Sequence, residues 1–189
     1  MRRVAATDVP AALRLWRETR ERLYREHLQS PVPADRRAGF RADHFEHDPA
    51  LRFEILVEEP VAAGFQGTTV DLPVSAGGAM AFRRFGSVTI PFPAGDRSLD
   101  LYWMEGYAGG LFLPFRDATN GRETYGAGRY VLDAAKSADL GPGAARGSLV
   151  LDFNFAYQPS CAFDPKWACP LAPPANRLDL DVRAGERLP

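Results

Sequence analysis

Residues 114–130 have the sequence PFRDATNGRETYGAGRY, and the way in which this stretch turns governs how the second half of the chain pairs. Asn120-Gly121 stands between two runs of strand-forming residues. Asn-Gly is the strongest short-range signal for a β-hairpin, because a type I′ turn needs positive φ at both central residues. The pattern therefore predicts a two-residue turn with a fixed register. In that register the opposed residues are Thr119 and Arg122, Arg116 and Tyr125, and Phe112 and Arg129.

The predicted register sorts the hairpin side chains onto two faces, because successive strand residues point to opposite sides. One face is mostly apolar and is expected to meet the core; it carries Leu111, Leu113, Phe115, Asp117, Thr124 and Tyr130. A buried carboxylate is costly without hydrogen bonds. We therefore expect Asp117, Thr124 and Tyr130 to be structural polar residues, with Thr124 and Tyr130 as donors to Asp117. The opposite face carries most of the charge, on Arg116, Glu123, Tyr125 and Arg129, beside Phe112.

A second strand-like segment, GSLVLDFNFAY at 147–157, has the same alternation. If it pairs with the second hairpin strand, Asp152 and Asn154 join the charged face. Arginine forks match carboxylates and phosphates bidentately, so such a face suits a polar or anionic small molecule. The alternation by itself is equally typical of a solvated sheet face with cross-strand ion pairs.

The rest of the chain predicts a mainly β fold. From Leu51 onward, strand-like segments separated by turn residues recur about every 8–12 residues, a spacing too short for helical crossovers. We expect an antiparallel β-barrel or strongly curved sheet of about 8–9 strands. One long helix is expected before it, from Val9 to about Leu28, with Thr7 or Asp8 as its N-cap. Arg20 lies on the apolar stripe of that helix, so it either reaches out to solvent or meets an acidic group beneath.

Length and composition favour one ordinary globular domain. The 189 residues are expected to form a single domain with a helical N-terminal segment at 8–40 and a β-rich body at 51–183, which includes a Pro-rich loop at 158–175. The net charge of −1 argues against nucleic acid as a partner. No apolar run is long enough for a membrane span, and the start lacks the apolar stretch of a signal peptide. We therefore expect a cytoplasmic protein without a membrane partner. Its oligomeric state stays open.

Two other groups of residues are weaker candidates for chemistry. Cys161 and Cys169 lie in the Pro-rich loop; a disulfide is conceivable there, but two buried, inert thiols are favoured, because cytosolic cysteines are normally reduced. The histidines of HFEH, His44 and His47, are followed by Asp48-Pro49, which ends any helix that could present both to one ion. We expect no metal site there and no cofactor elsewhere, since the chain contains no phosphate loop, nucleophile elbow or HExxH motif.

Three segments closely resemble one known family. FLPFRDATNGRETYGAGRYVLD, LVLDFNFAYQPSCAF and CPLAPPANRL are similar to the bacterial and archaeal family called domain of unknown function 1684. The resemblance implies a bacterial protein and no established activity. It points to the charged hairpin residues, to Asp152, Asn154 and Tyr157, and to both cysteines. Because a solvated face does not normally hold a family motif, the resemblance favours a ligand pocket or a buried polar network.

The functional prediction has two forms. In the first, a small polar or anionic organic molecule is bound by Arg116, Arg129, Tyr125, Asn154 and Asp152. Any reaction would be acid–base chemistry without a cofactor, with Asp152 or Glu123 as base and Tyr125 or Tyr157 as acid. In the alternative, the protein is a non-catalytic structural or interaction module and the motif is a buried polar network. The sequence does not decide whether the protein is an enzyme.

Overall fold

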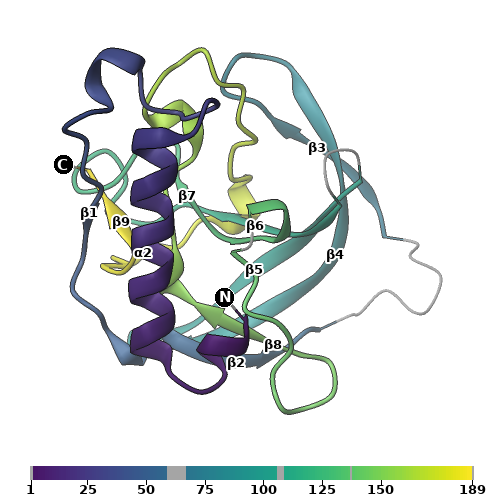
Figure 1. The fold of residues 1–189 in the computed structure, drawn as a ribbon. Coiled ribbons are helices and arrows are strands. Elements are labelled where there is room, and N and C mark those ends of the chain that lie inside the picture. Colours follow the sequence, from purple (N-terminus) through teal and green to yellow (C-terminus); the bar gives the residue numbers. More distant parts are fainter. Residues whose placement is uncertain (1, 59–66, 106–108, 137, 189) are drawn as a thin grey trace.

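The computed structural model describes residues 2–58, 67–105, 109–136 and 138–188. Nine strands lie in these ranges, and all of the sheet pairings are antiparallel (Figure 1). This confirms the predicted mainly β fold with its N-terminal helix. The strands belong to one five-stranded sheet, of order β3-β4-β5-β6-β7, and to two two-stranded sheets, β2-β8 and β1-β9. The described strands form no closed barrel, so the curved-sheet form of the prediction is the one that holds.

The long helix begins and ends where capping chemistry predicts. After a short helix α1 (Arg2–Ala5), α2 covers Val9–Glu26. The Asp8 side chain caps α2 by accepting from the Ala11 amide at 2.8 Å. Pro10 stands in the first turn, where its missing N–H costs nothing. The residues that α2 buries include Leu13 and Trp16 of the predicted stripe, and also Arg20.

The five-stranded sheet is formed by β3 (Thr69–Pro73), β4 (Ala79–Phe92), β5 (Gly95–Met104), β6 (Gly110–Phe115) and β7 (Arg129–Asp133). The segments AMAFRRF and SVTIPF, which were predicted as separate strands, form one 14-residue strand, β4, with a register shift between Arg84 and Gly86. A shift of this kind bends a strand without ending it, which suits a curved sheet.

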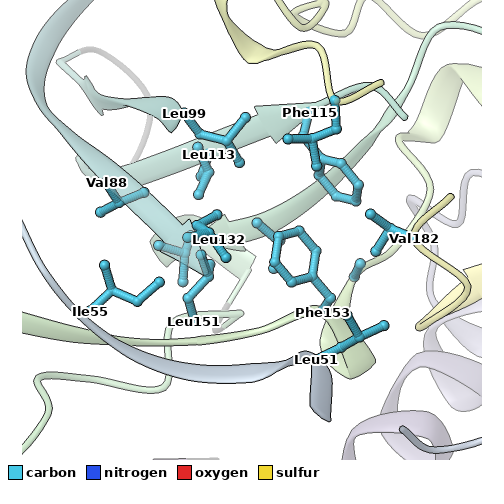
Figure 2. Close-up of a cluster of buried hydrophobic side chains, with 14 of the residues drawn as sticks. Leu51, Ile55, Val88, Leu99, Leu113, Phe115, Leu132, Leu151, Phe153 and Val182 are labelled. Carbon is cyan, nitrogen blue, oxygen red and sulfur yellow. The ribbon is translucent and has the colours of Figure 1, made fainter. Parts of the chain in front are cut away.

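Both faces of this sheet are covered. On one face, Val88, Leu99 and Leu113 pack against residues of β2 (Arg52–Leu56) and β8 (Ser148–Asp152). Figure 2 shows Ile55 and Leu151 pointing toward these side chains. On the other face, buried aromatic residues of β6 and β7 pack with the apolar side of α2; the cluster includes Leu13, Trp16, Phe112, Tyr130 and Tyr157. Phe112, the apolar residue of the second hairpin face, therefore lies under α2, whereas the charged residues of that face are not part of this cluster.

The predicted hairpin register is wrong. β6 and β7 do pair, but Arg129 lies opposite Phe115, three residues beyond its predicted partner Phe112. A further irregularity falls between Leu113 and Pro114. Since strand side chains alternate, a shift by an odd number of residues moves a side chain to the other face. Arg129 consequently lies on the face of Phe115, with its guanidinium carbon 5.2 Å from the Phe115 ring centroid.

The expected pairing and extent of the later segments also need correction. β8 pairs with β2, whereas only an isolated bridge between Tyr130 and Tyr157 links the 147–157 segment to β7. β8 ends at Asp152, and a 3-10 turn, η4 (Phe153–Phe155), follows. The segment NRLDLDV at 176–182 has strand-like alternation but forms no strand in the described structure, and Arg177 makes a parallel bridge to Arg116. Strand β9 is a two-residue pairing of Glu186–Arg187 with β1 (Asp43–His44).

Candidate functional site

The Asn-Gly segment folds into a compact loop held by its own side chains. The Thr119 carbonyl accepts hydrogen bonds from the amides of Arg122, Glu123 and Thr124. The Asn120 side chain accepts from the Asp117 amide and donates to the Thr124 hydroxyl, both at 2.8 Å. Short polar side chains compete in this way for backbone groups that a hairpin ladder would otherwise use. These hydrogen bonds form a longer loop in place of the predicted two-residue turn.

Arg129 is the centre of a buried polar network. Its guanidinium is fully buried, and Nη2 donates to Asp117 Oδ2 and to the Val182 carbonyl, both at 2.7 Å. Nη1 donates to the carbonyls of Ala184 and Glu186. The remaining Nε–H is buried and has no partner among the described residues. With both terminal nitrogens occupied and no exposed surface, Arg129 ties β7 to the C-terminal segment.

Asp117 and Thr124 are both buried, as predicted, but their partners differ from the expectation. Asp117 Oδ1 accepts from the amide and the hydroxyl of Thr119, and Asp117 Oδ2 pairs with Arg129. Thr124 contacts the Thr119 hydroxyl at 2.8 Å, so it reaches the Asp117 carboxylate through the Thr119 hydroxyl rather than directly. Tyr130, the other expected donor, lies on the opposite face and donates to the Pro170 carbonyl at 2.6 Å.

The other predicted ligand-binding residues are not gathered around Arg129. Arg116 is half-buried, and its Nη2 donates to the Gly126 carbonyl at 2.8 Å. Asp152 and Asn154 lie at the end of β8, where Asp152 pairs with Arg52 at 3.0 Å and also accepts from the Asn154 amide group. Asn154 in turn exchanges two hydrogen bonds with the backbone of Asp48. Each of these side chains therefore connects separate segments of the chain. That they bind a ligand stays a prediction.

The four residues predicted for acid–base chemistry have separate partners. Glu123 is bound by Arg183, which lowers the pKa of its carboxyl. Tyr157 is fully buried and donates to Asp133; burial, reinforced by the Asp133 charge, raises its pKa well above the ordinary value. Burial, together with a hydrogen bond to Cys161, raises the pKa of Tyr125 to about 12. No hydrogen bond between any two of Glu123, Tyr125, Asp152 and Tyr157 is found in the described structure.

A second buried ion pair lies under α2. Arg20 donates to Glu186, and the Tyr24 hydroxyl donates to the same carboxylate at 2.9 Å. The Gln158 amide also donates to Glu186, at 2.9 Å. Burial is the largest single influence and lowers the pKa of Arg20, but Glu186, Tyr24 and Tyr157 together outweigh it and the net pKa is raised. Sequence reasoning identified Arg20 from its place on the apolar stripe but missed Glu186, because a Glu near the end of the chain has no distinctive pattern.

Beside this ion pair lies a cleft of about 390 Å³ between α2 and residues 157–160, which we call the α2 cleft. Its lining includes Arg20, Leu23, His27, Lys136, Tyr157 and Ser160. The guanidinium carbon of Arg20 lies 4.2 Å from the Tyr157 ring centroid, and Lys136 Nζ lies 5.6 Å from the same centroid. Lys136 is exposed and has no carboxylate partner in the described ranges. Two cations therefore meet one aromatic ring at this cleft, and Glu186 pairs with only one of them.

The weaker candidates are placed as follows. His44 belongs to β1 and lies opposite Glu186 of β9, whereas His47 is exposed. Across the described residues, no three His, Cys, Asp or Glu side chains form a group that could hold a metal ion. Cys161 and Cys169 are free and buried. None of the described helices has the length and apolar character needed to cross a membrane.

Comparison with known proteins identifies the family. The sequence model described as "Protein of unknown function (DUF1684)" matches residues 40–187. A solved structure is also similar: the solution NMR structure of an uncharacterized protein from gene locus rrnAC0354 of Haloarcula marismortui. The two chains are 31% identical, the match covers 97% of this chain and 96% of that one, and the TM-score is 0.67. The curated proteins contain no significant match. The chain belongs to the DUF1684 family.

Proposed function

We propose that this protein binds a small organic molecule bearing an anionic group, and that the molecule occupies the α2 cleft. The observation that supports the proposal is the pair of cations on Tyr157. Arg20 is neutralised by Glu186, whereas Lys136 stands exposed at the cleft without a carboxylate partner in the described ranges. An anionic oxygen group of a ligand would supply that partner, in a setting less hydrated than open water.

The shape and lining of the cleft support a small ligand. Its volume of about 390 Å³ falls within the range of about 300–1,000 Å³ that is usual for ligand sites. Leu23 and Pro31 supply apolar surface, and the side chains of Thr19, Gln29 and Ser160 supply hydrogen-bonding groups. An apolar wall with a few polar groups is the ordinary composition of a small-molecule site.

The proposal concerns binding rather than catalysis. Tyr157, which was predicted as an acid, holds its proton tightly because burial raises its pKa well above the ordinary value. Burial also raises the pKa of Tyr24, the other tyrosine of the cleft. An efficient general acid needs a pKa near the working pH. Neither hydroxyl meets that requirement.

Benzoate and benzamide form a suitable pair of probes, since they share a ring and differ in charge. We expect benzoate to raise the melting temperature of the protein in a concentration-dependent manner and benzamide to have a much smaller effect. Lys136→Ala should reduce the benzoate shift. Lys166→Ala is the matched control, because Lys166 Nζ also lies 5.6 Å from an aromatic centroid but is paired with Asp164. A benzoate shift of equal size in Lys136→Ala and wild type would refute the proposal.

A second candidate function is a non-catalytic structural or interaction module. It is supported by Arg129, which has no exposed surface and uses both terminal nitrogens within the protein. On this alternative the 114–130 motif stabilises the fold, and substitutions in it would lower stability without altering a ligand response. We further propose a location in the bacterial cytoplasm, supported by the free thiols of Cys161 and Cys169.

A further inference from the structure

The two cysteines of the Pro-rich loop lie in direct contact. The Cys161 amide donates to Cys169 Sγ at 3.2 Å, and the two thiols hydrogen-bond each other. Each residue is 6% exposed. Neither is in a disulfide. The loop thus holds two reduced sulfurs side by side although seven residues lie between them in sequence.

Polar groups from two other parts of the chain surround this pair. The side chains of Ser75 and Tyr125 both hydrogen-bond Cys161. Ser75 is fixed against the loop, because its amide donates to the Cys169 carbonyl and its hydroxyl accepts from the Cys169 amide, each at 2.9 Å. Structural cysteines usually lie in apolar surroundings, and that was the basis for expecting inert thiols. The hydroxyl groups here make a different environment.

The hydrogen bonds act oppositely on the two sulfurs. Hydrogen bonds, the largest from Cys169 and others from Ser75 and Tyr125, lower the pKa of Cys161 to about 6. The hydrogen bond to Cys161, together with burial, raises the pKa of Cys169. Of the two sulfurs, Cys161 is therefore the one whose thiolate form these hydrogen bonds favour, and Cys169 is the donor between them. A thiolate beside a protonated thiol is the arrangement that lets one sulfur attack and the other resolve.

We propose that Cys161 and Cys169 form a peroxide-reactive dithiol, in which Cys161 is the attacking sulfur and Cys169 the resolving one. The Cys161 thiolate attacks one oxygen of hydrogen peroxide, the O–O bond breaks, and a sulfenic acid and hydroxide form. Cys169 then attacks the Cys161 sulfur; the S–S bond forms and the S–O bond breaks. The Cys169 proton and one proton from solvent combine with the two hydroxides, so both peroxide oxygens leave as water. Both sulfurs are oxidised, and both peroxide oxygens are reduced. This proposal does not rest on the ligand proposed for the α2 cleft.

Intact-mass measurement of the reduced full-length chain tests the proposal directly. An equimolar amount of hydrogen peroxide at pH 7 should remove two hydrogen masses, and peptide mapping should link Cys161 to Cys169 within one chain. The rate of this loss should rise with pH through about 6 and then level off. A rate that keeps rising toward the pKa of an ordinary thiol, or a product containing only intermolecular links, would overturn the proposal. This measurement needs no variant and therefore does not depend on a mutant that folds.

Three variants separate the roles of the groups. Cys169→Ser should accumulate a sulfenic acid at Cys161 that dimedone traps, whereas Cys161→Ser should leave Cys169 unmodified under the same treatment. Tyr125→Phe should slow oxidation several-fold and move the pH midpoint upward, since one donor to the thiolate is lost. A purely structural role for Tyr125 would leave that midpoint unchanged. Dimedone labelling of Cys169 before Cys161 would contradict the assignment of the attacking sulfur.

Discussion

Arg129→Met removes the cation from the buried network while keeping a side chain of similar length. Asp117, whose side chain is 0% exposed, would keep its charge but lose Arg129. The carbonyls of Val182, Ala184 and Glu186 would lose their donors as well. Removing one partner of a buried ion pair costs about 3–5 kcal/mol, because the other charge stays buried without compensation. That loss is a large part of the ~5–15 kcal/mol that stabilises a typical domain.

Urea unfolding followed by circular dichroism measures this loss as a change in the free energy of unfolding. Arg183→Met is the control, since Arg183 is an exposed residue paired with Glu123 and its loss should matter far less. The double variant Asp117→Leu with Arg129→Met should be more stable than Arg129→Met alone. In the double variant neither charge of the Asp117–Arg129 pair remains buried. The reasoning is refuted if Arg129→Met and wild type unfold at the same urea concentration, or if the double variant is the least stable of the three.

Three further substitutions test other parts of the fold. Gly128→Ala should lower the melting temperature more than Gly121→Ala does: both glycines have positive φ, but an added Cβ would meet the Phe115 carbonyl oxygen at 2.5 Å at Gly128 and nothing within 4 Å at Gly121. Asn176→Ala should cost about 2–4 kcal/mol in urea unfolding. The reason is that the buried Asn176 side chain makes three hydrogen bonds, which join β5 to β6. Equal stability of Asn176→Ala and wild type would contradict this expected loss. Glu186→Gln should cost about 3–5 kcal/mol by the same measurement, because Arg20 would stay buried and charged; a loss no larger than that of Arg183→Met would contradict this.

Local patterns were sufficient for α2 and for most of the strands. The spacing of Leu13 and Trp16 and the capping residue Asp8 predicted α2 nearly to its observed bounds. Alternation and turn residues predicted most of the antiparallel strands, because both signals are encoded within a few neighbouring residues. Arg20 was identified as anomalous, since it is a cation on an apolar stripe; of the two outcomes left open, the structure shows the acidic partner rather than exposure to solvent.

Pairing over longer distances could not be predicted in this way. The Asn-Gly signal was read as a two-residue turn, but the side chains of Asp117 and Asn120 bind the backbone of their own loop and make the connection longer. A register error of three residues then placed Arg129 on the wrong face and separated it from Asp117, its actual partner. Glu186 could not be found, because its importance depends on a contact with α2 across 166 residues of sequence.

The sequence by itself determined the family, the mainly β class, the N-terminal helix and the presence of an Arg-rich polar motif at 114–130, since all of these rest on local composition and spacing. Only the tertiary structure decided what the charges of that motif do. It buries Arg129 against Asp117 and the C-terminal segment, and it leaves Lys136 at the α2 cleft without a carboxylate partner among the described residues. It also brings Tyr125 to the two cysteines. The physical reason is that the effect of a charge or a thiol depends on its burial and its partners, and distant parts of the chain supply both.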